Sequence, residues 1–116
     1  MPFRVIVLPR ALADLDKAYR YAAKRAPLTA KRWLERFQHA IEGLANGPER
    51  WPLAHESKQA KLPLREMLFG RKPNVFRVIF EIVDDEVQVL RIRRGARRWL
   101  SKKEIEERRP ADENEH

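Results

Sequence analysis

The sequence predicts a single α+β domain in which an N-terminal strand and an antiparallel helical hairpin precede three antiparallel strands. Apolar residues recur every three or four positions from Pro9 to Leu44, which is the period of amphipathic helices. From Leu64 to Arg94 they fall in short alternating or continuous runs, which are typical of strands. The chain of 116 residues is long enough for one hydrophobic core and too short for two. We therefore expect one sheet with both helices on one of its faces.

The first strand and the first helix adjoin at Pro9. Residues 3–8 are apolar apart from Arg4, so this segment is predicted to be a strand with apolar side chains on both faces. Proline suits the first turn of a helix, where its missing N–H costs nothing. We expect this helix to run to about Arg25 and to end before Pro27. Its apolar stripe consists of Leu12, Leu15, Tyr19 and Ala22.

A second helix is expected from about Thr29, whose hydroxyl is a suitable N-cap. Asn46 and Gly47 supply its C-terminal stop, and Pro48 follows. The apolar stripe of this helix consists of Trp33, Leu34, Phe37, Ile41 and Leu44. Because the link between the two helices is short, they should form an antiparallel hairpin. Strands must then cover the apolar face that the two helices share.

Three strands are expected in the second half of the chain. A loop over residues 48–61 leads to a strand at 64–69, and a turn then leads to a long strand at 75–83. Residues 84–86 connect this strand to the last one, at 87–94. Apolar and other side chains alternate along the long strand, which gives it one strongly apolar face. Leu90 and Ile92 are the expected matching pair on the last strand.

The register of the last two strands depends on the length of the loop between them. A three-residue loop would pair Val83 with Val87 and Arg77 with Arg93, and both apolar sets would then lie on the same side. A two-residue loop would put the apolar set of one strand on the opposite side of the sheet from that of the other. We therefore expect the three-residue loop.

In that register Arg77, Arg91 and Arg93 point away from the helices, and we call this surface the arginine face. Two arginines directly opposite each other repel unless an anion lies between them. One interpretation is a surface that binds anions; the other is that Glu81 and Asp85 neutralise the arginines locally. An exposed arginine contributes little to folding, so alanine at position 77 or 93 should cost little stability.

The charge of the chain is unevenly distributed. The net charge is +8, and residues 58–103 carry thirteen lysines and arginines against five acidic residues. Residues 104–116 carry two basic residues against six acidic ones. A basic block of this kind is expected of a protein that meets nucleic acid or an acidic partner.

The C-terminal region is expected to open a short helix and then to lose structure. Ser101 and Glu104 form a capping-box pattern, which marks the start of a helix. We expect the folded domain to occupy residues 1–104. Residues 105–116 should comprise the end of that helix and a disordered acidic tail.

The sequence also predicts a cytoplasmic protein with no membrane partner. The apolar run at residues 3–8 is interrupted by Arg4 and followed at once by Pro9, which does not fit a signal peptide. No apolar run approaches the length of a membrane span. Cysteine is absent, which excludes disulfides and is compatible with a reducing compartment.

Several segments resemble the RelE/ParE toxin superfamily over roughly residues 3–100. The most specific is the stretch from Val75 to Arg98, VFRVIFEIVDDEVQVLRIRRGARR, with its arginine strand, acidic tip and basic end. The helical hairpin, with Ala13-Asp14-Leu15 early and residues 30–34 later, is similar to the longer hairpins of ParE-like members. The closing phrase at residues 41–48, IEGLANGP, is also typical of those members.

The resemblance implies a growth-inhibiting toxin of a type II toxin–antitoxin module, of the kind that stabilises plasmids. A cognate antitoxin with a small acidic C-terminal segment would neutralise it. ParE-like members are implied to poison DNA gyrase, and RelE-like members to cleave mRNA in the ribosomal A site; neither needs a metal or a cofactor. We favour the ParE-like branch. A non-toxic nucleic-acid-binding module is a third alternative.

The resemblance also suggests which residues would act in a RelE-like enzyme. Arg65, Arg77 and Arg97 fall where RelE-like cationic catalytic residues would fall. However, Met67 stands where a further lysine would be expected, and Lys103 lies near the position of a C-terminal tyrosine. Arginine holds its proton too firmly to act as a general acid or base at neutral pH. This shortage of acid–base groups favours gyrase as the target.

Binding residues are expected on the arginine face and just after the last strand. The candidates for binding the target or the antitoxin are Arg77, Arg91, Arg93, Arg98 and Trp99. Trp99 is placed either to stack on a base or to pack against the fold. His39 and His55 are interpreted as surface or structural histidines, because both are distant in sequence from the arginine strands.

Overall fold

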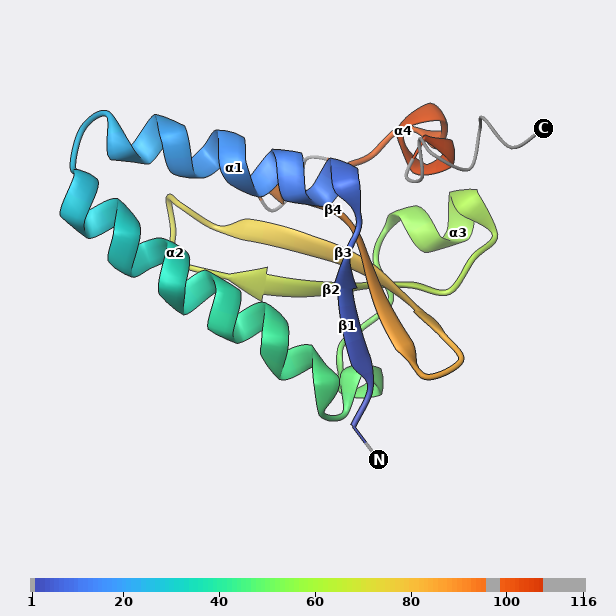
Figure 1. The fold of residues 1–116 in the computed structure, drawn as a ribbon. Helices are drawn as coiled ribbons and strands as arrows, with labels where there is room; N and C mark the ends of the chain where they lie inside the picture. Colours follow the sequence, from blue (N-terminus) through green and yellow to red (C-terminus); the bar gives the residue numbers. More distant parts are fainter. Residues whose placement is uncertain (1, 96–98, 108–116) are drawn as a thin grey trace.

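The computed structural model describes residues 2–95 and 99–107 (Figure 1). Two short 3-10 turns, Gly43–Ala45 and Pro48–Arg50, follow the second helix. The helices and strands are, in chain order, β1 (Arg4–Val7), α1 (Pro9–Ala23), α2 (Pro27–Glu42), α3 (Glu56–Ala60), β2 (Leu64–Phe69), β3 (Phe76–Val83), β4 (Glu86–Arg94) and α4 (Lys102–Glu106). The predicted α+β fold is confirmed. The helix α3 was not expected, since the sequence suggested only a loop there.

The four strands form one sheet in the order β1-β4-β3-β2. The three strands of the second half are antiparallel, as expected. β1 pairs with β4 in parallel, so the sheet as a whole is mixed. A parallel pair requires a crossover between its strands, and the hairpin of α1 and α2 lies within that crossover.

Both faces of the sheet are covered. On one face α1 and α2 pack over the larger core, in which the fully buried members Phe37, Val78 and Phe80 meet. On the other face a smaller apolar cluster contains Ile79, which alternates with those β3 residues, together with Leu100 and Ile105 from the C-terminal segment. In Figure 1, α3 and α4 lie close together, beyond the N-terminal end of α1. The expectation of helices on one face therefore holds for α1 and α2.

The helix boundaries follow from prolines at the first turns. Both α1 and α2 begin with a proline at the first helical position, and neither has a side-chain cap. The expected N-cap at Thr29 is therefore wrong, because Pro27 starts the helix two residues earlier. At the far end, Gly47 adopts the left-handed conformation (φ 64°) that glycine tolerates without strain.

The hairpin between β3 and β4 has a two-residue loop, so the expected three-residue loop is wrong. Val83 pairs with Glu86 rather than Val87. Asp84 has φ 56°, which a tight hairpin turn of this length requires. Farther along, the register shifts by one residue at a β-bulge between Ile79 and Phe80.

The bulge restores the pairing that the loop would otherwise have changed. Phe80 pairs with Val89 and Ile79 with Arg91, so Leu90 is the extra residue. Beyond it, Arg77 lies opposite Arg93, as predicted. Leu90 packs in the smaller cluster and not beside Ile92, which corrects the expected pair.

The ends of the described chain bear on two further expectations. Residues 105 and 106 are the end of α4, and Ile105 is buried at 2% exposure. The rest of the predicted tail, from residue 108, lies outside the described residues. None of the helices in the described part combines the length and the apolar character that a membrane crossing requires.

Candidate functional site

Arg77 lies in the interior of the protein, between two carboxylates. Its side chain is fully buried. The guanidinium donates from Nη1 and Nη2 to the two carboxylate oxygens of Glu56, at 3.0 and 2.7 Å, and from Nε to Glu66 at 2.6 Å. This bidentate geometry with charge-assisted bonds is the strongest form that an arginine–carboxylate contact takes. Arg77 therefore joins α3, which carries Glu56, to β2 and β3.

Glu56 connects this pair to the C-terminal segment. It is fully buried at the start of α3, and its Oε2 also accepts the Leu100 N–H at 2.7 Å. Burial raises the pKa of Glu56, but the hydrogen bonds from Arg77 and from Leu100 outweigh it, so the net shift is downward. The same pairing raises the pKa of Arg77 although burial opposes it. Both groups are thus charged inside the protein at neutral pH.

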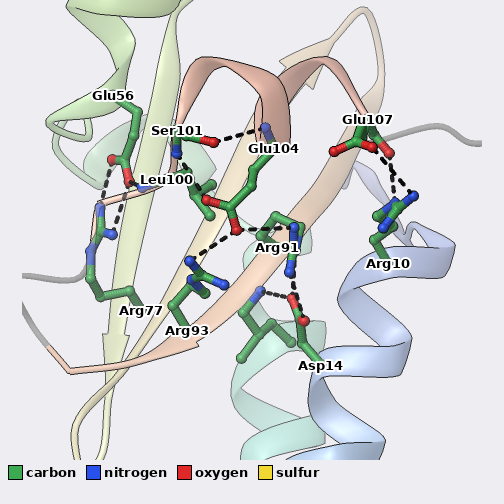
Figure 2. Close-up of polar contacts among 11 residues, drawn as sticks. Arg10, Asp14, Glu56, Arg77, Arg91, Arg93, Leu100, Ser101, Glu104 and Glu107 are labelled. Atoms are coloured by element: carbon green, nitrogen blue, oxygen red, sulfur yellow. Dashed lines mark hydrogen bonds and ion pairs between the residues drawn. The ribbon is translucent and has the colours of Figure 1, made fainter.

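Arg91 and Arg93 are held by acidic side chains from two helices (Figure 2). Asp14 of α1 accepts two hydrogen bonds from Arg91, at 2.8 and 3.0 Å. Glu104 of α4 lies 2.9 Å from Nη2 of Arg93 and 3.7 Å from Nη1 of Arg91. The Asp14 bonds raise the pKa of Arg91.

Asp14 also completes the edge of the sheet. β1 pairs with β4 only as far as Val89, so the outer edge of β4 is open beyond that point. The carboxylate of Asp14 accepts the N–H of Ile92 there, at 2.9 Å. A buried backbone donor must find a partner, which explains why an acidic residue faces the sheet from an otherwise amphipathic helix.

These contacts correct the expected arginine face. The prediction that Arg77 is exposed is wrong, since Glu56 and Glu66 enclose it. The neutralising groups expected for the three arginines were Glu81 and Asp85. The structure supplies them instead from Glu56, Glu66, Glu104 and Asp14. The pairing of Arg77 with Arg93 was predicted correctly, and the acids lying nearby make the like charges tolerable.

Of the other candidate residues, Arg65 holds a loop in place and His39 is exposed at the surface. Arg65 donates from one nitrogen to the carbonyls of Glu49, at 3.1 Å, and Trp51, at 2.6 Å, and so fixes the loop before α3. Arg97 and Arg98 lie outside the described residues. His39 is exposed on α2, in agreement with a surface role.

Trp99 is brought together with His55 and Arg77. Its ring stacks on the His55 imidazole, with 4.3 Å between ring centroids and 15° between planes. The Arg77 guanidinium carbon lies 4.9 Å from the centroid of the Trp99 ring. Trp99 thus packs against the fold, yet 43% of it stays exposed. The sequence distance between His55 and the arginine strands gave no sign of this contact.

A groove of about 700 Å³ lies between the helical hairpin and the end of the sheet. Its apolar and aromatic lining includes Tyr21, Trp33, Phe76 and Ile92. The charged residues along it are one carboxylate, Asp14, and five cations, Lys17, Arg25, Arg36, Arg93 and Arg94. An apolar lining with an excess of positive charge fits an acidic, amphipathic segment of a partner protein.

A family model described as ParE toxin of type II toxin-antitoxin system, parDE, matches residues 5–99. The chain belongs to this toxin family. Toxin RelE2 of Caulobacter vibrioides (strain ATCC 19089 / CIP 103742 / CB 15) is 38% identical over 88 residues, which are 76% of this chain and 90% of that protein. A solved structure described as the chromosomal ParDE TA system from P. aeruginosa shares the fold, with a TM-score of 0.64 and 23% identity over 79% of this chain and 95% of that one.

As a ParE-family member, the protein is the toxin of a type II toxin–antitoxin system, and such a system implies a cognate antitoxin. The sequence analysis of this ParE-family toxin did not predict which acidic residues hold its arginines. Glu104 had a visible signal, because a capping box fixes its position. Glu56 and Asp14 had none, because only the tertiary fold brings them to Arg77 and Arg91.

Proposed function

We propose that the protein is a non-enzymatic growth inhibitor that acts on DNA gyrase in the cytoplasm. The observation that carries this proposal is the engagement of Arg77, which is fully buried and bonded to two carboxylates. A catalytic cation must reach the scissile phosphate, and Arg77 does not reach the surface. Arg65, the second candidate for such a role, is bonded to backbone carbonyls.

The chemistry of RNA cleavage supports the same choice. Cleavage needs a base, an acid for the leaving oxygen and cations at the reacting phosphate. Histidine is the side chain that most often serves as such a base, and the ring of His55 stacks on that of Trp99. A toxin that acts by binding has no need of acid–base residues. The RelE-like endoribonuclease remains the alternative, and the name of the Toxin RelE2 relative favours testing it.

We predict that expression of this protein alone arrests bacterial growth through gyrase. Cells should form filaments, plasmids should lose negative supercoiling, and purified protein should inhibit gyrase-catalysed supercoiling. Messenger RNA should stay intact, which primer extension on induced transcripts would measure. The control is the Phe37→Ala variant, which we expect to lose the folded core and therefore the toxicity.

Other outcomes would identify the alternatives. Rapid translation arrest with codon-spaced mRNA ends would replace gyrase with the ribosome as the target. Normal growth at a high level of folded protein would favour the non-toxic nucleic-acid-binding module.

We further propose that an acidic segment of the antitoxin binds the groove. Lys17, Arg25 and Arg36 are exposed along the hairpin, and the aromatic side chains of Tyr21 and Trp33 line the same groove. A segment that is disordered when free would gain its binding energy from this apolar surface and its specificity from the charges.

Reversing two charges in the groove should release the toxin from its antitoxin. We expect Lys17→Glu with Arg36→Glu to weaken antitoxin affinity by about tenfold or more, because complementary charges become repulsive. The matched control is Lys24→Glu with Lys31→Glu, which makes the same change of charge at exposed positions outside the groove. Calorimetric titration would measure both. Equal effects of the two pairs would show that only total charge matters, and the groove would lose its role.

A further inference from the structure

A group of exposed cations lies at one end of the molecule, apart from the arginine face. Arg77, Arg91 and Arg93 are each paired with carboxylates in the fold. Five other cations are exposed and form no ion pair with any residue in the described ranges. We call them the basic end, and they are Arg25, Arg36, Arg71, Lys72 and Arg94.

The groove brings three segments of the chain together at the basic end. Arg25 of α1, Arg36 of α2 and Arg94 of β4 line it, together with Asn74 of the turn between β2 and β3. The carboxylate that also lines it, Asp14, is already bonded to β4. The positive charge of this end is therefore not neutralised by its own lining.

The turn between β2 and β3 holds two of these cations on a fixed backbone. Gly70 has φ 98°, and a Cβ there would collide with the Asn74 carbonyl oxygen, so the turn requires glycine. The Asn74 N–H donates to the Arg71 carbonyl at 2.7 Å, and Arg94 donates to the Asn74 side-chain oxygen at 2.6 Å. Arg71 and Lys72 are exposed on this turn. A ligand that binds them does not have to order the loop first.

The opposite end of the sheet carries acidic residues. β3 runs from the turn of Arg71 and Lys72 to the hairpin loop of Asp84 and Asp85. Its eight residues span roughly 25 Å at about 3.3 Å per residue. This length exceeds the distance of about 8 Å over which charges act at physiological salt. The acidic loop therefore does not neutralise the basic end, and the charge separation would turn the basic end toward a polyanion.

We propose that the basic end binds the phosphate backbone of duplex DNA. Arg71 and Lys72 do not line the groove, and the neighbouring turn residues Gly70, Pro73 and Asn74 form no apolar pocket with them. An acidic peptide would lack an apolar contact there. A duplex, in contrast, presents one negative charge about every 1.7 Å along its axis and is held mainly by such cations.

The inference goes beyond the proposed function. Gyrase acts on DNA, so a toxin that holds the duplex would contact the enzyme and its substrate together. For this use at gyrase the inference rests on the proposed function. The binding of DNA itself does not.

Binding of a short labelled DNA duplex, followed by fluorescence anisotropy, tests the basic end without gyrase. We expect the logarithm of the affinity to fall with the logarithm of the salt concentration with a slope of about −3 or steeper, because three or more phosphates are contacted. Arg71→Gln with Lys72→Gln should weaken binding about tenfold or more. The slope should become less steep by about 2, because two phosphate contacts are lost.

The matched control is Lys58→Gln with Lys102→Gln, which removes the same charge at exposed positions of α3 and α4. In Figure 1 these helices lie far from the link between α1 and α2. We expect the control to change the affinity less than about threefold and to keep the slope. Arg25→Gln with Arg36→Gln, on the hairpin side of the basic end, should behave as the turn variant does. Circular dichroism would show that each variant is folded, as expected for exposed positions.

The contrary outcomes are distinct. A loss of the same size for the turn pair and the control pair would overturn the proposal, and so would a turn variant with the wild-type slope. Affinity that does not depend on salt would exclude the phosphate backbone. Tighter binding of single-stranded RNA than of a duplex of the same length would exclude duplex DNA as the ligand. None of these measurements uses gyrase or growth, so a failure of the basic end and a failure of the proposed target are separate results.

Discussion

Replacing Arg77 with alanine is expected to destabilise the protein by about 3–5 kcal/mol, because it leaves a buried carboxylate without its counter-ion. Glu56 is fully buried and would keep its bond from the Leu100 N–H but lose both bonds from the guanidinium. Glu66 would lose its bond at 2.6 Å as well. This outcome is opposite to what an exposed arginine would give.

Urea unfolding followed by circular dichroism would measure the change as a shift in midpoint. Arg32→Ala is the control, since this arginine is exposed on α2 and should change the free energy of unfolding by less than about 0.5 kcal/mol. A double change of Arg77→Met and Glu56→Leu should recover part of the loss, because it removes both buried charges together. A loss below about 1 kcal/mol for Arg77→Ala would contradict the buried pair.

Phe37→Ala is the second change with a large expected effect, about 3–5 kcal/mol of stability. Phe37 is fully buried at the centre of an aromatic group. Its ring stacks on Phe69 at 4.3 Å between centroids and meets Trp33 at 5.4 Å and Phe76 at 5.6 Å. Alanine would open a cavity between α2 and two strands, and the rigid rings around it would collapse only partly.

The same helix offers a matched control for this change. Leu28 is 74% exposed, so Leu28→Ala removes an apolar side chain of α2 that lies outside the core. We expect a change of less than about 0.5 kcal/mol for Leu28→Ala. Thermal unfolding of both variants would show whether the midpoint falls for Phe37→Ala and not for Leu28→Ala. Similar midpoints would mean that α2 does not pack through Phe37.

Most of the fold could be predicted because apolar residues recur at regular spacings along its strands and helices. The strand Leu64–Phe69 was expected with the bounds that the structure gives. The capping box at Ser101 also predicted the start of α4, since its residues hydrogen-bond to one another. The helix α3 was missed because its five residues are too few to show a period.

The candidate site was harder to predict because it depends on contacts across long sequence distances. Arg77 and Glu56 are 21 residues apart, and Arg91 and Asp14 are 77 apart. The bulge at Leu90 offsets the shorter loop, so the Arg77–Arg93 pair is the one expected. Sequence alternation therefore gave the correct pair of arginines, but it could not indicate that helices lie over them.

The parallel pairing of β1 with β4 has a consequence for the timing of synthesis. Among the described strands β1 is made first, and its neighbour in the sheet, Glu86–Arg94, is made last. Closing so long a loop is entropically costly, and contacts of this range form late in folding. A nascent chain that has not yet reached residue 86 has a hairpin of helices but no complete sheet to support it. A growth inhibitor built in this way acquires its shape only when translation of the folded region is almost complete.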